Sequence, residues 1–102
     1  YFEMDYDFIT CSHVLEHCPD PKKVMKIFYE SLKNDGYIHI QIPLSTYDEY
    51  MGHYPHFAYW KDKNAFCEFL EDCNFNVEYW EYGTEHNRQP YDDLMVIIKK
   101  NI

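Results

Sequence analysis

Residues 6–21 read YDFITCSHVLEHCPDP, and this stretch decides the fold class of the chain. Its first part contains a short run, Phe8–Thr10 flanked by Tyr6 and Cys11, that suits a strand buried on both faces of a parallel sheet. The polar turn after it carries several ionisable side chains. Because ligands of open α/β sheets bind at the carboxyl ends of the strands, the stretch also predicts where a functional site would lie.

A helix is predicted directly after this turn. Asp20 suits the N-cap and Pro21 the first helical position. The apolar stripe of the helix consists of Val24, Ile27, Phe28 and Leu32. The run KNDG at residues 33–36 predicts its end, with Gly36 as a left-handed cap. A strand at residues 37–42, stopped by Pro43, completes a right-handed βαβ unit with two parallel strands.

The second half of the chain predicts one more helix and two more strands. Residues 44–60 have no clear period and predict a long loop. A helix is expected from near Asp62, with Asn74 as its stop and an apolar face formed by Phe66, Phe69, Leu70 and Cys73. Residues 75–82 alternate as in a half-buried strand, and residues 94–98 form the last strand. These two strands, joined without a helix, should pair antiparallel.

The predicted order is therefore β-α-β-loop-α-β-β. It describes an α/β fold, half of a doubly wound sheet with an antiparallel last strand pair, in one partial domain over residues 1–102. The chain does not begin with Met and enters a strand almost at once. We therefore expect a fragment, a processed product or a trimmed chain.

Composition narrows the classes of partner. The net charge of −9 disfavours binding to nucleic acid, whose phosphates an acidic surface repels. We also expect no membrane partner, because the apolar runs are only a few residues long. The four cysteines form no CxxC pair, so free thiols in a reducing compartment, the cytoplasm, are expected.

The order and spacing of the motifs resemble the second half of class I S-adenosylmethionine-dependent methyltransferases. That family reads roughly Asp-x-Ile, Val-Leu-Glu-His, Asp-Pro, Leu-Lys-x-Gly-Gly and a strand ending in Pro. The matching segments are residues 7–9, 14–17, 20–21, 32–36 and 37–43. The resemblance continues to about Lys100, with Asn74 where the family often has Gly. It implies a Rossmann-like methyltransferase sheet, S-adenosylmethionine as the cofactor and a small-molecule acceptor of an O- or N-methyl group.

The departures from the family pattern concern the cofactor. The Gly-rich loop of the family has no counterpart, because no GxGxxG exists and the three glycines are far apart. We therefore expect the chain alone to bind the cofactor poorly and to be inactive, and whether it is an enzyme stays open. The cofactor contacts that the resemblance leaves in this chain are Cys11, Ser12 and His13.

The turn after the first strand holds the main candidate site. If it becomes helical, His13, Glu16 and His17 share one face. Two imidazoles and a carboxylate could hold a divalent metal ion, or the trio could simply line a pocket. In a methyltransferase the proton of the acceptor could pass to His13, His17 or His53, the last on the long loop.

Two functions outside catalysis stay open. A half sheet leaves its first strand with an unpaired edge, which a partner chain or a second copy could cover in a non-catalytic interaction or scaffold module. A small metal-binding domain that uses His13, Glu16, His17 and Cys18 is the weaker alternative.

Overall fold

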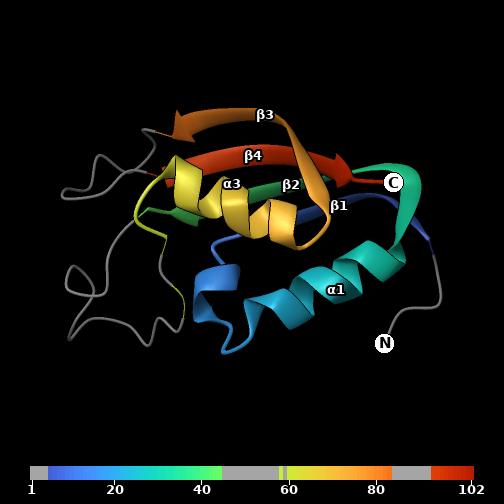
Figure 1. Cartoon of the computed structure of the whole chain (residues 1–102), viewed down its shortest axis with the longest axis horizontal. Coiled ribbons are helices and arrows are strands. Elements are labelled where there is room, and N and C mark those ends of the chain that lie inside the picture. The colour runs from blue at the N-terminus through green and yellow to red at the C-terminus, as the bar shows by residue number, and fades with distance from the viewer. Residues whose placement is uncertain (1–4, 45–57, 59, 84–92) are drawn as a thin grey trace.

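The structure is a computed structural model that describes residues 5–44, 58, 60–83 and 93–102. Its elements follow in the predicted order (Figure 1), with one short 3-10 helix, η1, added after the first strand. They are β1 Tyr6–Ser12, η1 Leu15–His17, α1 Pro21–Ser31, β2 Leu32–Pro43, α3 Lys63–Asp72, β3 Phe75–Gly83 and β4 Asp93–Lys100. None of the helices in these ranges is long and apolar enough to cross a membrane.

The strands of the described residues form one sheet in the order β1-β2-β4-β3. β1 and β2 are parallel, and β4 runs antiparallel to both of its neighbours. The predicted βαβ unit and the predicted antiparallel last pair are both confirmed. The carboxyl ends of β1 and β2 therefore lie beside the start of β4, which brings residues from three distant segments together.

The start of α1 agrees with the prediction, but its end does not. Asp20 caps the helix through Oδ1, which accepts a hydrogen bond from the backbone N of Lys23 at 3.3 Å. α1 ends at Ser31 and β2 begins at once with Leu32, so the prediction of Gly36 as a left-handed helix cap is wrong. Gly36 lies inside β2 instead.

Gly36 is required by a close approach between the first two strands. A Cβ at this position would lie 2.8 Å from the backbone O of Asp7 and 2.7 Å from Cδ1 of Leu32. Carbon atoms do not pack at such distances without displacement of their neighbours. The glycine thus permits β1 to lie close to β2 where the register of the two strands shifts, between Tyr6 and Phe8.

α3 begins and ends as predicted. Oδ1 of Asp62 accepts from the backbone N of Ala65 at 2.8 Å, which caps the helix. Phe66 and Leu70 are buried against the sheet. Asn74 follows the helix with a φ of 70°, in the left-handed region that asparagine tolerates better than most residues.

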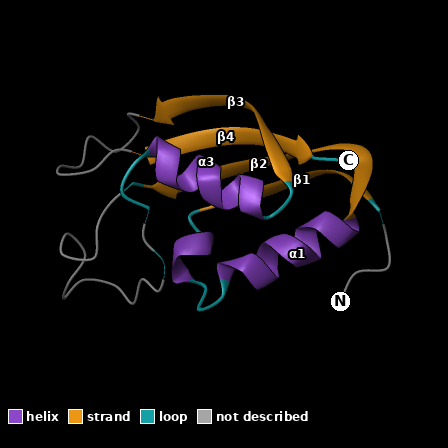
Figure 2. Cartoon of the chain, viewed as in Figure 1, coloured by secondary structure: helices purple, strands orange, loops and turns teal. Residues whose placement is uncertain are grey.

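One face of the sheet packs against the two helices. Figure 2 shows α1 and α3 on the same side of the strands. The core between them contains Met25, Phe66, Leu70, Ile38, Ile40, Ile42, Leu94, Val96 and Ile98. Side chains of the opposite face remain exposed among the described residues, with Phe8 57% and Tyr37 43% accessible. The prediction that β1 is buried on both faces is therefore wrong.

The alternation predicted for β3 holds only in its first part. Phe75 is buried and Val77 half-buried, but the register with β4 shifts between Val77 and Tyr79. A bulge reverses the face of every later residue. Tyr79 and Trp80 are both exposed, so the prediction fails after the bulge.

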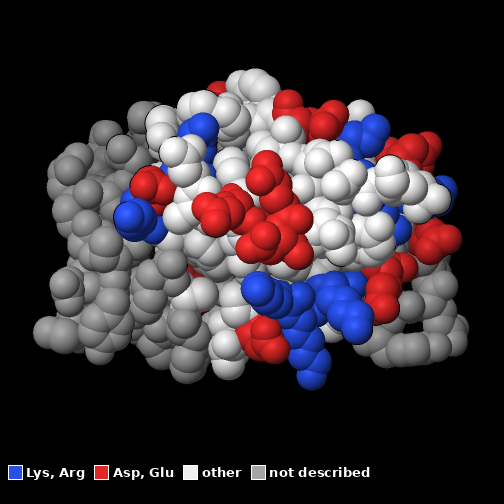
Figure 3. All heavy atoms as spheres, viewed as in Figure 1, with Lys and Arg blue, Asp and Glu red and all other residues white. Residues whose placement is uncertain are grey.

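The two helices carry surface charges of opposite sign. In Figure 3 acidic atoms gather over α3 and basic atoms over α1, on the face that is viewed. The exposed acidic residues of α3 are Glu68, Glu71 and Asp72, and the exposed basic residues of α1 are Lys22, Lys23 and Lys26. These lysines form one solvated helix face beside an acidic one.

Replacement of Gly36 by Ala should destabilise the chain by about 1–3 kcal/mol, because the added Cβ would meet backbone that cannot move aside cheaply. Urea unfolding of the wild type and of the Gly36→Ala variant measures the difference. Asn34→Ala, at an exposed position of the same strand, is the control and should change stability by less than about 0.5 kcal/mol. Equal stability of Gly36→Ala and wild type would show that the strands can separate without cost.

Substitutions at Asn74 should separate by their tolerance of a positive φ. Asn74→Gly should leave stability unchanged or raise it by a few tenths of a kcal/mol, whereas Asn74→Ala should cost about 1 kcal/mol. Thermal unfolding of the two variants, compared with the exposed-site variant Asn76→Ala, checks this order. An Ala variant as stable as the Gly variant would contradict the left-handed conformation.

Candidate functional site

The candidate site begins where β1 ends. His13 follows Ser12 with a φ of 57°, a left-handed conformation that turns the chain sharply out of the strand. Its backbone N donates to the carbonyl O of Gln41 at 2.8 Å, one residue beyond the Ser12–Gln41 pair of the parallel ladder. The turn is therefore tied to the end of β2, and it holds the imidazole at the carboxyl edge of the sheet.

The short helix η1 then carries the next two ionisable residues. Leu15 is fully buried and anchors this turn in the core. The carbonyl O of Glu16 accepts from the backbone N of Ala58 at 3.3 Å, and Glu16 itself is only 2% exposed. The sequence therefore places a carboxyl group inside the protein, directly after a strand end that ligands commonly use.

The imidazole of His13 lies between two buried carboxyl groups. Its Nε2 is 3.3 Å from Oδ2 of Asp93, and its Nδ1 is 3.7 Å from Oε2 of Glu16. Nε2 of Gln41 donates to the same Oδ2 of Asp93 at 3.2 Å. Asp93 is 6% exposed, and its contacts join the end of β2, the turn after β1 and the start of β4.

Glu16 has the most unusual environment of these groups. Burial raises the pKa of its carboxyl, and the nearby His13 and His17 lower that pKa only in part. The second carboxyl oxygen, Oε1, is buried and has no hydrogen-bond partner among the described residues. Nε2 of His17 lies 3.8 Å from Oε2, too far for a hydrogen bond. Since a buried polar atom without a partner is costly, Oε1 of Glu16 marks a functional candidate.

The structure brings the predicted trio of His13, Glu16 and His17 together, with Glu16 between the two imidazoles. It does not support the metal hypothesis, because no group of three or more His, Cys, Asp or Glu side chains among the described residues could hold a metal ion.

The residues predicted to contact a cofactor differ in their access to solvent. Ser12 is exposed at the end of β1, and His13 is partly exposed. Cys11 is buried, and burial raises the pKa of its thiol to about 11, so its side chain belongs to the core. His53, the third predicted base, lies outside the described residues.

Sequence reasoning missed Asp93 and Gln41. Gln41 is a polar residue in an apolar strand, two positions before Pro43, and this interruption is a signal that could have been used. Asp93 lies 52 residues after Gln41, at the end of a polar connection, and no local pattern distinguishes it from its neighbours. Only the antiparallel pairing of β2 with β4 brings the two residues together.

Residues 2–87 match the model of a methyltransferase domain family. Among solved structures, an S-adenosylmethionine-dependent methyltransferase from Clostridium acetobutylicum is 10% identical, with a TM-score of 0.74 over 100% of this chain and 61% of that one. A protein from Bacillus halodurans that is described as a methyltransferase is 15% identical, with a TM-score of 0.76 over 100% of this chain and 67% of that one.

LepI, solved in complex with S-adenosylmethionine, is 8% identical, with a TM-score of 0.69 over 95% of this chain and 27% of that one. At such identities these likenesses show the fold alone. The chain spans about 61% of the length of the Clostridium relative. No curated protein matches it.

Glu16→Gln should change how stability depends on pH. Because burial raises the pKa of Glu16 above its ordinary 4.5, the folded chain keeps this proton to a higher pH than the unfolded chain does. The stabilisation from the neutral form is complete below about pH 4.5 and is lost as the pH rises through the folded-state pKa. The wild type should therefore lose stability relative to Glu16→Gln as the pH rises above about 4.5.

Urea unfolding at a series of pH values measures this difference. Glu68→Gln, at an exposed position of α3, is the matched control and should run parallel to the wild type. Parallel curves for Glu16→Gln and wild type would contradict a raised pKa at Glu16.

Proposed function

The chain belongs to the methyltransferase domain family, and we propose that it forms the acceptor-binding side of an S-adenosylmethionine-dependent methyltransferase. The acceptor would be a small molecule that receives the methyl group on oxygen or nitrogen. The observation that carries this proposal is the group of His13, Glu16 and Asp93, two buried carboxyls around one imidazole at the carboxyl ends of β1 and β2. That edge is where ligands of open α/β sheets bind.

The described residues fit one side of a cofactor site. Ser12 and His13 present polar atoms at the strand end, whereas Cys11 is buried. Gly36 is needed for the close approach of β1 and β2. The remaining contacts would come from another part of the methyltransferase fold, since this chain spans only part of the relatives' length. When bound, the cofactor supplies an electrophilic methyl group.

The residues of this chain would position the acceptor and take its proton. An acceptor O–H or N–H group must lose a proton when its oxygen or nitrogen gains a methyl group. An imidazole is well suited to accept this proton near neutral pH. His13 and His17 are the described candidates, and His53 is a further candidate. Four free cysteines suit a reducing compartment, and we propose the cytoplasm.

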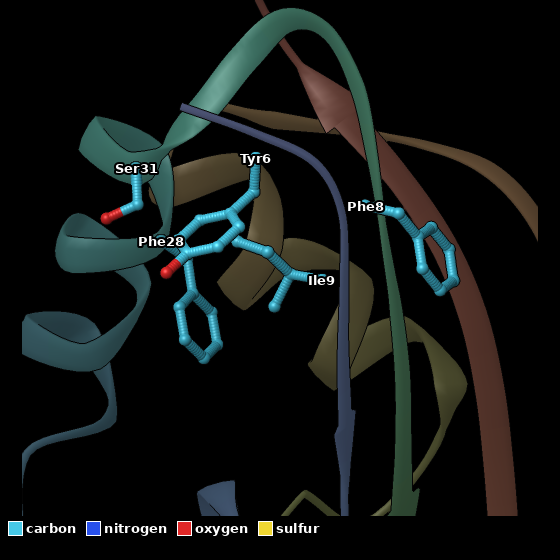
Figure 4. A pocket seen from close by; sticks show the side chains of 5 residues that line it. All are labelled: Tyr6, Phe8, Ile9, Phe28 and Ser31. Carbon is cyan, nitrogen blue, oxygen red and sulfur yellow. The ribbon is translucent and has the colours of Figure 1, made fainter. Parts of the chain in front are cut away.

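A second candidate function, an interaction module, is favoured by the side of β1 that pairs with no other strand among the described residues. A pocket of about 220 Å³ lies between β1 and α1, lined by Tyr6, Phe8, Ile9, Phe28 and Ser31. Figure 4 shows Phe28 beneath the Tyr6 ring, while Phe8 projects on the other side of the strand. Exposed aromatic side chains beside a sheet edge suit a partner chain or a second copy of this one.

A nuclear magnetic resonance titration with S-adenosylhomocysteine tests the methyltransferase proposal. A site with one wall should bind the ligand only weakly, with a Kd of roughly 1 mM, and shift the amide signals of Ser12 and His13 selectively. Ser12→Trp should abolish these shifts, whereas Asn34→Trp, at an exposed position away from the strand end, should not.

The mass in solution, recorded on the same sample, separates the two functions. Micromolar binding by a dimer would mean that a second copy completes the site. A dimer with no localised shifts would favour the interaction module. A folded monomer with no localised shifts would contradict the methyltransferase proposal for this part of the chain.

A further inference from the structure

Asp93 is the least expected member of the candidate site. It is the first residue of β4, and it pairs with Pro43 of β2 on one side and Gly83 of β3 on the other. Asp93 therefore places a carboxyl group on an inner strand of the sheet, at the end of the sheet where β1 and β2 finish. A carboxyl group that is 6% exposed needs strong partners to remain there.

Two contacts of Gln41 link Asp93 to His13. The carbonyl O of Gln41 accepts from the backbone N of His13 at 2.8 Å. The side-chain Nε2 of Gln41 donates to Oδ2 of Asp93 at 3.2 Å, and that oxygen is 3.3 Å from Nε2 of His13. One residue of β2 therefore holds the backbone of His13 and also the carboxyl group that faces its ring.

We propose that Asp93 is a positioning residue that fixes His13 as its Nε2–H tautomer and so makes Nδ1 the nitrogen that accepts a proton. An ionised carboxylate offers only lone pairs, so a ring nitrogen that faces it carries the hydrogen. In a neutral imidazole the other nitrogen then has the lone pair. The tautomer thus follows from the 3.3 Å contact between Asp93 and His13.

The surroundings of Nδ1 suit a nitrogen that gains a proton. Nδ1 faces Oε2 of Glu16 at 3.7 Å, on the inner side of the turn. When Nδ1 is protonated, the imidazolium lies between the carboxyl groups of Asp93 and Glu16, and an opposite charge on either side stabilises it. The other oxygen of this buried carboxyl group, Oε1 of Glu16, has no hydrogen-bond partner in the part of the chain that the structure describes.

This inference deepens the proposed function and rests on it only for the source of the proton. If the site receives a methyl acceptor, the proton of its hydroxyl or amine group is the one that Nδ1 takes. Asp93 acts through His13, so its effect should be visible on the ring of His13 without any acceptor or cofactor.

The test is a nitrogen-15 correlation spectrum of the histidine rings of the chain, recorded at pH 8, where imidazoles are ordinarily neutral. The shifts of the two ring nitrogens report which of them carries the hydrogen. The signals of His13 are identified by their loss in His13→Gln. The wild type should show the Nε2–H tautomer, and an Nδ1–H ring in the wild type would overturn the proposal.

Substitution of Asp93 carries the test further, because free histidine also favours the Nε2–H form. Asp93→Leu removes the acceptor that faces Nε2, so the ratio of the Nε2–H to the Nδ1–H tautomer should fall towards that of free histidine, by at least about fivefold. Asp93→Glu, which keeps the carboxylate, should restore the wild-type ratio. Asp72→Asn, on the exposed face of α3, is the control and should leave it unchanged. An unchanged ratio in folded Asp93→Leu would overturn the proposal.

Gln41→Leu keeps the test decisive if Asp93→Leu does not fold. Loss of the amide that holds Oδ2 of Asp93 should shift the ratio in the same direction by about twofold or more, and an unchanged ratio would count against the proposal. No cofactor enters these measurements. A failure of S-adenosylhomocysteine to bind would leave the tautomer result intact, and a wrong tautomer would leave the cofactor result intact.

Discussion

The close approach of β1 and β2 at Gly36 is the constraint on which the site depends. Gly36 lets the backbone at Asp7 pass where a Cβ would lie 2.8 Å from the carbonyl O, so the two strands can pair in parallel as far as Ser12 and Gln41. That pairing ends at a fixed point. The left-handed turn at His13 starts there, and its backbone bonds to Gln41. A different register would place the imidazole beside other residues and leave Asp93 without its link to β1.

The fold could be predicted from the sequence where local signals agreed with each other. Asp20 and Pro21 marked one helix start, Asp62 marked the other, and Asn74 marked a helix end through the conformation that its side chain tolerates. Gly36 misled the prediction because its local pattern is that of a helix cap. Its role comes in part from a contact with the backbone of Asp7 in another strand, and the local pattern around Gly36 does not contain that information.

The site could be predicted only in the part that is local in sequence. His13, Glu16 and His17 lie within five positions of one another, and their approach follows from one short turn. The 52-residue separation of Gln41 and Asp93 hides the second half of the site. The geometry also changed the chemistry that the trio suggests. Glu16 is buried, Asp93 lies on the far side of the ring, and no group of three or more such side chains in the described part of the chain could hold a metal ion.

The two faces of the sheet bear on how such a site can work. α1 and α3 bury one face, and the aromatic side chains of Phe8 and Tyr37 stay exposed on the other. A buried carboxyl group such as Glu16 keeps a raised pKa only while water is excluded from it. A low local dielectric also strengthens the attraction between opposite charges, such as Asp93 and a protonated His13. The raised pKa of Glu16 and the proposed action of Asp93 on His13 therefore depend on the same condition, the exclusion of water from the carboxyl ends of β1 and β2.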